Sequence, residues 1–309
     1  MSKKLWQPSL IVKKNSNLFA FENYISKKLK IKFNRNYKKL LNWSIKNSPE
    51  FWSRFWDFSK IKGIKSNKNF RKSKTFYKNL FLPGSRLNFG ENLLSKNNNE
   101  KAATFISENG FREERSWRQL NLNTNKISKF LKKINIKKGD RVAAYMPNTI
   151  ETVEAFIATT SLGGIWSSCS PDFGSKGVIE RFSQINPKVL FITDQYFYNG
   201  KKIDILNRLP EILKLIPSIK SVVISNYPGK KLIKNKYKFK KINLFKWNEL
   251  MQTNAEKIDF KRFDFETELA ILYSSGTTGK PKCICHRSGG VLIQHMKEHQ
   301  LHCNIKEND

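Results

Sequence analysis

Apolar and polar positions follow a regular pattern from about residue 101 onward. Short apolar runs predict strands, and stretches with apolar residues three and four positions apart predict helices. The expected strands are 103–108, 112–117, one within 137–148, 165–170, 188–194, 221–226, 269–274 and 283–286. The expected helices are 117–134, 150–164, 175–187 and 203–216. Strands alternating with helices form βαβ units, so the pattern predicts an α/β fold with a largely parallel sheet.

Glycine and proline mark several expected boundaries. Asn109–Gly110 lies between the first two strands and is typical of a hairpin turn. Gly163–Gly164 is a natural end for the helix that precedes it. Pro187 is expected to stop the helix 175–187, and Pro210 to kink or break the helix 203–216.

The first hundred residues have a different texture, rich in lysine and asparagine. Aromatic residues recur there at near-helical spacing, namely Trp43, Phe51, Trp52, Phe55 and Trp56. We interpret them as packing a small helical cap onto another domain rather than as a surface for stacking bases. An Asn run and a glycine within 87–100 indicate a boundary nearby.

The formal net charge of the 309-residue chain is +33. Such a charge first suggests a polyanionic partner, and a Lys-rich nucleic-acid-binding protein is one alternative. Only 12 of the 58 basic residues are arginine, whereas base recognition favours the planar arginine fork. We therefore expect no specific nucleic-acid partner.

No run of about twenty apolar residues predicts a membrane span, and the N-terminus lacks the apolar core of a secretory signal. The four cysteines suit no disulfide framework. We expect a cytoplasmic protein with no membrane partner.

One segment has an unusual composition, the sequence YSSGTTGKPK at 273–282. It follows one expected strand and precedes another. Its hydroxyls and glycines suit close approach to a ligand, and its backbone amides and lysines suit phosphate. It is not a Walker A loop, because two residues separate its glycines and Pro281 follows the first lysine. The alternative is a polar hairpin tip.

This segment resembles the phosphate-binding signature of the adenylate-forming ligases. The likeness extends over 139–201 and 271–305, where the chain is similar to the acyl-CoA synthetases that activate acetoacetate, and FWSRFWDF at 51–58 resembles the N-terminal cap of the acetyl-CoA synthetase branch. The resemblance implies a doubly wound sheet, a cap at 1–100 and the first part of the AMP-binding domain at 101–309. It also implies ATP, Mg²⁺ and coenzyme A as cofactors and acetoacetate as substrate. An acetyl- or propionyl-type synthetase is the nearest alternative.

The resemblance assigns two sets of residues. It places the β- and γ-phosphates of ATP on Ser274, Ser275, Gly276, Thr277, Thr278, Gly279 and Lys282. Lys280 is expected to face solvent and to be dispensable. The second set, Tyr198, Asn199, Gly200 and Lys201, falls where relatives bind the 3′-phosphate region of coenzyme A, and a plain surface turn is an equal alternative there.

The family's catalytic lysine has no counterpart within the 309 residues. We therefore expect no catalytic residue here, no activity of the fragment alone, and a complementing C-terminal half as a possible partner.

A competing hypothesis comes from the tail. His295, Glu298 and His299 match the H-x-x-E-H pattern of some zinc peptidases, in which two histidines bind zinc and the glutamate acts as base. The pattern is short, and the family resemblance already covers this stretch. We therefore expect no metal-binding residues and keep the zinc metallopeptidase as an alternative.

Overall fold

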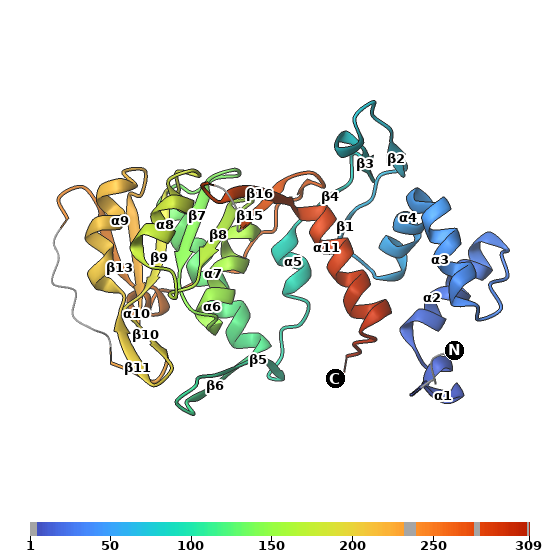
Figure 1. The fold of residues 1–309 in the computed structure, drawn as a ribbon, viewed down its shortest axis with the longest axis horizontal. Helices are drawn as coiled ribbons and strands as arrows, with labels where there is room; N and C mark the ends of the chain where they lie inside the picture. The colour runs from blue at the N-terminus through green and yellow to red at the C-terminus, as the bar shows by residue number, and fades with distance from the viewer. Residues whose placement is uncertain (1–4, 232–238, 275–278, 308) are drawn as a thin grey trace. The chain divides into compact units, whose positions relative to one another are not determined.

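The computed structural model describes residues 5–231, 239–274, 279–307 and 309. It forms two compact units (Figure 1). The larger unit comprises Asn88–Phe263 and Thr267–Arg287, and the smaller comprises the described part of Met1–Leu87, Asp264–Glu266 and Ser288–Asp309. This spatial division uses other boundaries than the domain division that the family resemblance implies.

The larger unit begins with a short helix and a hairpin and continues as alternating strands and helices. Its elements are α5 (Phe89–Leu93), β5 (Lys101–Ile106), β6 (Arg112–Ser116), α6 (Trp117–Lys133), β7 (Arg141–Tyr145), α7 (Ile150–Ser161), β8 (Ile165–Cys169), α8 (Ser175–Phe182), β9 (Val189–Thr193), β10 (Gln195–Tyr198), β11 (Lys201–Asp204), η2 (Leu206–Arg208), α9 (Leu209–Leu215), β12 (Ser221–Ser225), β13 (Asn243–Lys246), α10 (Trp247–Met251), β15 (Glu268–Ser274) and β16 (Lys282–Arg287). The strand β14 (Phe263–Asp264) lies at the boundary between the units.

Seven of these strands form the central sheet, in the order β13-β12-β9-β7-β8-β15-β16. Neighbouring strands run parallel from β13 to β15, and only β16 is antiparallel to its neighbour. The predicted α/β fold with a largely parallel sheet is therefore confirmed.

Helices cover both faces of this sheet. On one face, Tyr145 of β7 packs in a buried cluster with Phe182 of α8 and Leu209 of α9. On the other face, the ring of Phe191 in β9 contacts Trp247 of α10 at 6.1 Å between centroids. Strands covered on both sides read as nearly continuous apolar runs, which is why their positions were visible in the sequence. The sheet is doubly wound, as the resemblance implied.

Two expected helices differ from the prediction. The helix α8 ends at Phe182, five positions before Pro187. A tighter turn follows it, because the amides of Gln184 and Ile185 donate to carbonyls three positions back, and Asn186 then adopts a left-handed backbone with φ of 48°. Pro210 neither kinks nor breaks a long helix. It lies in the first turn of α9, where its missing amide costs nothing, and the strand β11 and a 3₁₀ turn precede it.

The smaller unit contains helices and short strand pairs. Its elements are α1 (Leu10–Lys14), α2 (Asn17–Leu29), α3 (Tyr37–Lys46), α4 (Ser48–Phe58), β1 (Gly63–Ile64), β2 (Phe70–Arg71), η1 (Phe76–Lys78), β3 (Leu80–Phe81), β4 (Arg86–Leu87), α11 (Ser288–Lys297) and the π-helical turn η3 (Glu298–His302). Its core is aromatic, since the buried Phe21 contacts Phe51, Phe55 and Phe58 at 5.0–5.6 Å between centroids. The helical interpretation of the N-terminal aromatics fits these contacts.

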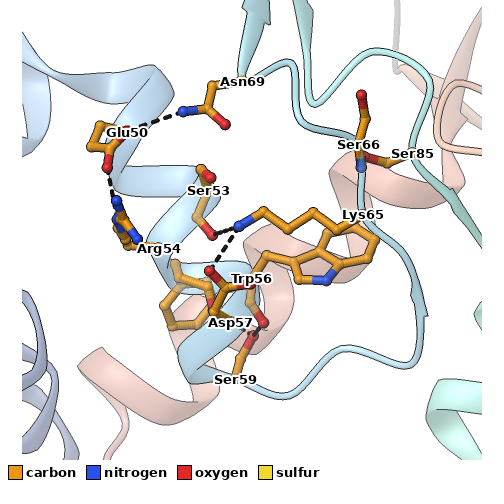
Figure 2. Close-up of polar contacts among 11 residues, drawn as sticks. Glu50, Ser53, Arg54, Trp56, Asp57, Ser59, Lys65, Ser66, Asn69 and Ser85 are labelled. Carbon is orange, nitrogen blue, oxygen red and sulfur yellow. Dashed lines mark hydrogen bonds and ion pairs between the residues drawn. The ribbon is translucent and has the colours of Figure 1, made fainter. Parts of the chain in front are cut away.

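Polar contacts from α4 hold the chain that follows it (Figure 2). The Lys65 ammonium donates to the Ser53 carbonyl and to the Asp57 carboxylate, both at 2.8 Å. The Glu50 carboxylate accepts from Arg54 at 2.6 Å and from Asn69 at 3.0 Å. Residues 62–69 are thereby attached to one face of α4.

The last described residues return to the N-terminal helices. The backbone amide of Asn17 donates to the Asn304 side chain at 2.8 Å, and its side-chain amide donates to the Ile305 carbonyl at 3.0 Å. The Lys306 ammonium donates to the Asn15 carbonyl at 2.7 Å. The smaller unit is therefore built from both ends of the chain.

Candidate functional site

The carboxyl ends of the parallel strands share one edge of the sheet, which is the usual ligand side of such folds. Asn148 follows β7, Ser170 follows β8 and Tyr227 follows β12 at this edge. The segment 275–281 follows β15. Both sets of residues that the resemblance assigned come from segments that leave strands, so this edge is the candidate site.

Three of the seven expected phosphate-binding residues lie among the described residues, and Ser275, Gly276, Thr277 and Thr278 lie outside them. Ser274 ends β15 and pairs with Lys282, the first residue of β16. Gly279 has a φ of 94°, and no atom of the described residues lies within 4 Å of a Cβ built on it. Its glycine is therefore needed for the backbone conformation and not for space.

A side chain from α8 supports this segment. The Gln184 amide donates to the Pro281 carbonyl at 2.9 Å and to the Glu180 carbonyl at 2.8 Å. The sequence carried no signal for the first contact, because it joins residues 97 positions apart. It ties the segment before β16 to the end of a helix on one face of the sheet.

Tyr273, the first residue of the segment 273–282, is anchored in the sheet. The Ser167 hydroxyl lies 3.0 Å from the Tyr273 hydroxyl and 2.8 Å from the Ile271 carbonyl. Burial raises the pKa of Tyr273, so this phenol stays neutral. The Arg181 guanidinium lies 5.8 Å from the centre of the Tyr273 ring. Sequence reasoning gave none of these three side chains a role, although Tyr273 is the first residue of the segment.

Hydrogen bonds to its backbone carbonyls fix the segment that follows β8. The Arg208 guanidinium donates to the carbonyls of Pro171 at 3.0 Å and Phe173 at 2.8 Å, and the Tyr145 hydroxyl also donates to Phe173. Cys169, just before it, is buried, and desolvation raises its pKa to about 12. A thiol with that pKa is not a nucleophile at neutral pH, so this cysteine acts as a small packed side chain.

The four expected coenzyme A residues form the tip of a hairpin. Tyr198 ends β10 and Lys201 begins β11, and these two residues are paired. Asn199 and Gly200 both have left-handed backbones, with φ of 49° and 71°, as a two-residue type I′ turn requires. Lys201 is exposed. The structure thus brings the four together as a surface turn, and their role in binding coenzyme A stays a prediction.

Glu108, a residue that sequence reasoning missed, contacts this turn from another hairpin. The Glu108 carboxylate accepts from the Asn199 amide at 2.9 Å and from the Gly200 amide at 3.1 Å. Glu108 belongs to the turn between β5 and β6, and its partners lie more than ninety positions away. The tips of the two hairpins are therefore joined.

An open cleft of about 470 Å³ lies beside the joined hairpins. It is lined by Thr104, Phe105, Ile106, Ser107, Glu108, Pro147, Asn148, Ser170, Tyr196, Phe197 and Tyr227. Burial, with the nearby Asp172, raises the pKa of Tyr196 to about 12. The lining combines aromatic faces with neutral hydroxyls, which suits a flat heterocyclic ring.

The tail motif does not assemble a metal site among the described residues, which hold no group of three His, Cys, Asp or Glu side chains that could bind a metal. The rings of His295 and His299 lie 6.4 Å apart. Glu298 is paired with Lys297 at 2.6 Å and His302 at 3.5 Å, and the hydrogen bond from Lys297 lowers its pKa. The motif thus lies within ordinary surface ion pairs.

The described helices include none that is long and apolar enough to span a membrane.

Comparison with known proteins decides the family. The model of the AMP-binding enzyme family matches residues 94–308. The chain belongs to the AMP-binding enzyme family. The matched region includes both sets of predicted site residues and the Gln184 contact.

The relatives indicate a branch within this family. The chain is 38% identical to an acetoacetyl-CoA synthetase of Xenopus tropicalis, over 100% of the chain and 46% of the relative. It is 35% identical to an acetoacetyl-coenzyme A synthetase of Rhizobium meliloti, over 99% and 46%. The structure of the acetoacetyl-CoA synthetase from Streptomyces lividans matches with a TM-score of 0.89 and 28% identity, over 98% of this chain and 46% of that one. The chain spans about half the length of these relatives.

Proposed function

We propose that this chain contributes the ATP-phosphate-binding and coenzyme-A-facing part of an acetoacetate–CoA ligase. The reaction would convert acetoacetate, ATP and coenzyme A into acetoacetyl-CoA, AMP and pyrophosphate. The observation that carries the proposal is the position of the segment 274–282. It joins β15 to β16 at the ligand edge of a parallel sheet, within a match to the AMP-binding family. The acetoacetate assignment is supported by the names of the relatives.

The first step requires charge neutralisation, because an acid anion must approach a triphosphate. Ser274 would bind the β- and γ-phosphates through its hydroxyl, Gly279 through its backbone amide, and Lys282 would add a positive charge. Ser275, Gly276, Thr277 and Thr278 are proposed to complete the set. Fixed donors of this kind commonly supply several kcal/mol to a reaction of anions. Mg²⁺ would arrive with ATP and withdraw charge from its phosphates.

The second step brings a thiol to the activated acid. We place the 3′-phosphate region of coenzyme A at the turn Tyr198–Lys201, where the Lys201 ammonium is exposed. The cleft beside this turn offers Tyr196 and Phe197 to the adenine ring. The chain's contribution to this step is to bind and orient the carrier.

The same proposal includes the domain division, the place of the catalytic lysine and the cellular location. The cap would be residues 1–100, and residues 101–309 would be the first part of the AMP-binding domain. The catalytic lysine would lie on a further polypeptide segment or a complementing half, so these 309 residues would be inactive by themselves. We propose a cytoplasmic location.

A matched pair of lysines tests the phosphate assignment. Lys282 and Lys280 are both exposed and lie two positions apart, and only Lys282 is proposed to contact phosphate. We expect Lys282→Gln to weaken ATP binding to the chain by about five- to ten-fold, as loss of a charged hydrogen bond does. Lys280→Gln should change it less than about two-fold, as for a solvated surface charge. Titration calorimetry with ATP and adenosine measures both.

A selective loss of ATP affinity in Lys282→Gln, with adenosine binding unchanged, supports a phosphate contact. Equal effects of the two substitutions would assign the lysines to general electrostatic attraction. Binding of ATP unaffected by either substitution would contradict the assignment of Lys282.

A further inference from the structure

The joined hairpins contain an anion site that is already filled. In the turn between β10 and β11, the consecutive amides of Asn199 and Gly200 point to one carboxylate. Each carboxylate oxygen of Glu108 takes one amide, at 2.9 and 3.1 Å. Consecutive amides on left-handed residues form a small concave anion-binding site. A phosphate would use the same two donors with the same fork geometry.

Nothing near this contact buries it. Glu108, Asn199 and Gly200 are all exposed, and so are the adjoining Lys201 and Lys202. An exposed carboxylate gains little from such a contact, and it can leave at small cost. The contact is therefore reversible, and a ligand with more charge can replace it.

We infer that Glu108 is an internal competitor for the phosphate-binding turn and sets the affinity of this hairpin for coenzyme A. The inference rests on the proposed function. A phosphate that enters must first displace the Glu108 carboxylate, so its apparent affinity is reduced by the fraction of time that the turn is free. The same carboxylate repels a phosphate that approaches the exposed Lys201.

The inference makes a prediction about two ligands that differ by one group. Coenzyme A carries the 3′-phosphate, and dephospho-coenzyme A lacks it. Removing the Glu108 charge should tighten binding of the first and leave the second unchanged. A purely structural link between the hairpins would affect both ligands together.

The experiment is titration calorimetry of both ligands with the 309-residue chain. We expect Glu108→Gln and Glu108→Ala to bind coenzyme A about five-fold more tightly than the unmodified chain, the size expected for a partly solvated charge contact. Binding of dephospho-coenzyme A should change by less than about two-fold, since it carries no 3′-phosphate to compete with the Glu108 carboxylate. Glu114→Gln is the matched control, because it removes the same charge from the neighbouring strand β6, where its partners are Arg112 and Lys101.

Lys201→Gln separates failure of this inference from failure of the proposed function. If it weakens coenzyme A selectively while the Glu108 variants bind as the unmodified chain does, the ligand site stands and the competitor role is wrong. If the Glu108 and Glu114 variants gain equally, general electrostatics explains the effect and the inference is overturned. If the Glu108 variants bind both ligands more tightly, Glu108 is a structural link between the hairpins and the inference is overturned. No binding of coenzyme A to any variant would overturn both the ligand site and the inference.

Discussion

Different interactions stabilise the interior of each of the two compact units. In the larger unit, the strands β7, β9 and β12 are almost entirely buried, and helices pack on both faces. In the smaller unit, a cluster of aromatic rings around Phe21 forms the core, and polar contacts from α4 attach the following chain. The first kind of order depends mainly on burial, and the second depends also on a few specific charges.

The charge distribution makes this difference sharper. Residues 1–87 contain 22 lysines and arginines and only three acids. Each of these acids holds a distant part of the chain, since Glu22 accepts from the Arg35 amide, Glu50 from Asn69 and Asp57 from Lys65. In a lysine-rich region, the few carboxylates are used as attachments between segments. The net charge of a region therefore does not show which of its charged residues stabilise the fold.

The largest expected effect is in the core of the larger unit. Phe191 is fully buried in the middle of the sheet, and Phe191→Ala should lower the free energy of unfolding by about 3–5 kcal/mol. Phe55→Ala is the matched change in the smaller unit, where the ring is also fully buried. Hydrogen exchange followed by mass spectrometry should show lost protection mainly in 141–225 for the first variant and in 17–58 for the second. Equal loss in both regions from either variant would break the comparison.

The next effect concerns a buried carboxyl group of the larger unit. Burial raises the pKa of Glu154 to about 8 from an ordinary value of 4.5, although Asn123 donates to it at 2.8 Å and Arg115 lies 3.4 Å away. The folded state therefore holds a proton that the unfolded state releases. The stability from this group is complete below pH 4.5 and is lost as pH rises through about 8.

Glu154→Gln keeps the shape and removes the titration. We expect its free energy of unfolding to fall less between pH 5 and pH 8 than that of the unmodified chain, with a difference on the order of 2 kcal/mol. Glu256→Gln is the control, because this side chain is exposed. Urea unfolding at a series of pH values measures the difference. Parallel pH profiles for the unmodified chain and Glu154→Gln would show that the proton is not held in the folded state.

The smallest effect tests an attachment in the smaller unit. Lys65→Ala removes the donor to Ser53 and Asp57 shown in Figure 2, and it should cost about 1 kcal/mol, because the ion pair is partly exposed. Lys68→Ala removes the same charge from an exposed position nearby. Urea unfolding compares the two. Equal stability of both variants would mean that the attachment contributes nothing beyond net charge.

Much of the larger unit could be predicted because its strands are buried on both faces and its helices are amphipathic. Runs such as the one around Phe191 leave a local signal that needs no knowledge of the neighbours. The turn at Asn199–Gly200 also has a local sequence signal and could be predicted. The strands β10 and β11, which this turn joins, were not predicted. Pro210 was misread because proline suits both a break and a first helical turn, and only the neighbouring strand β11 decides between them.

The supporting contacts of the candidate site could not be predicted. Gln184 and Glu108 are ordinary surface residues in the sequence, and each meets its partner across about ninety positions. Such contacts depend on how the sheet places segments side by side, which no local pattern records. The family resemblance predicted which segments bind phosphate and coenzyme A, whereas the groups that hold those segments came only from the fold.

The return of the C-terminal residues to α2 has a consequence for synthesis on the ribosome. Asn17 donates to Asn304 and Ile305, which are made much later, so the N-terminal helices emerge long before the residues that complete their unit. At ordinary elongation speeds, the intervening sheet takes roughly 10–40 s to be made. During that interval Trp56 of α4 lacks Phe265, whose ring lies 6.2 Å away between centroids in the folded chain. The N-terminal segment therefore depends on the rest of the chain being translated promptly, and a pause in the middle of the message would leave it open to chaperones and to misassembly.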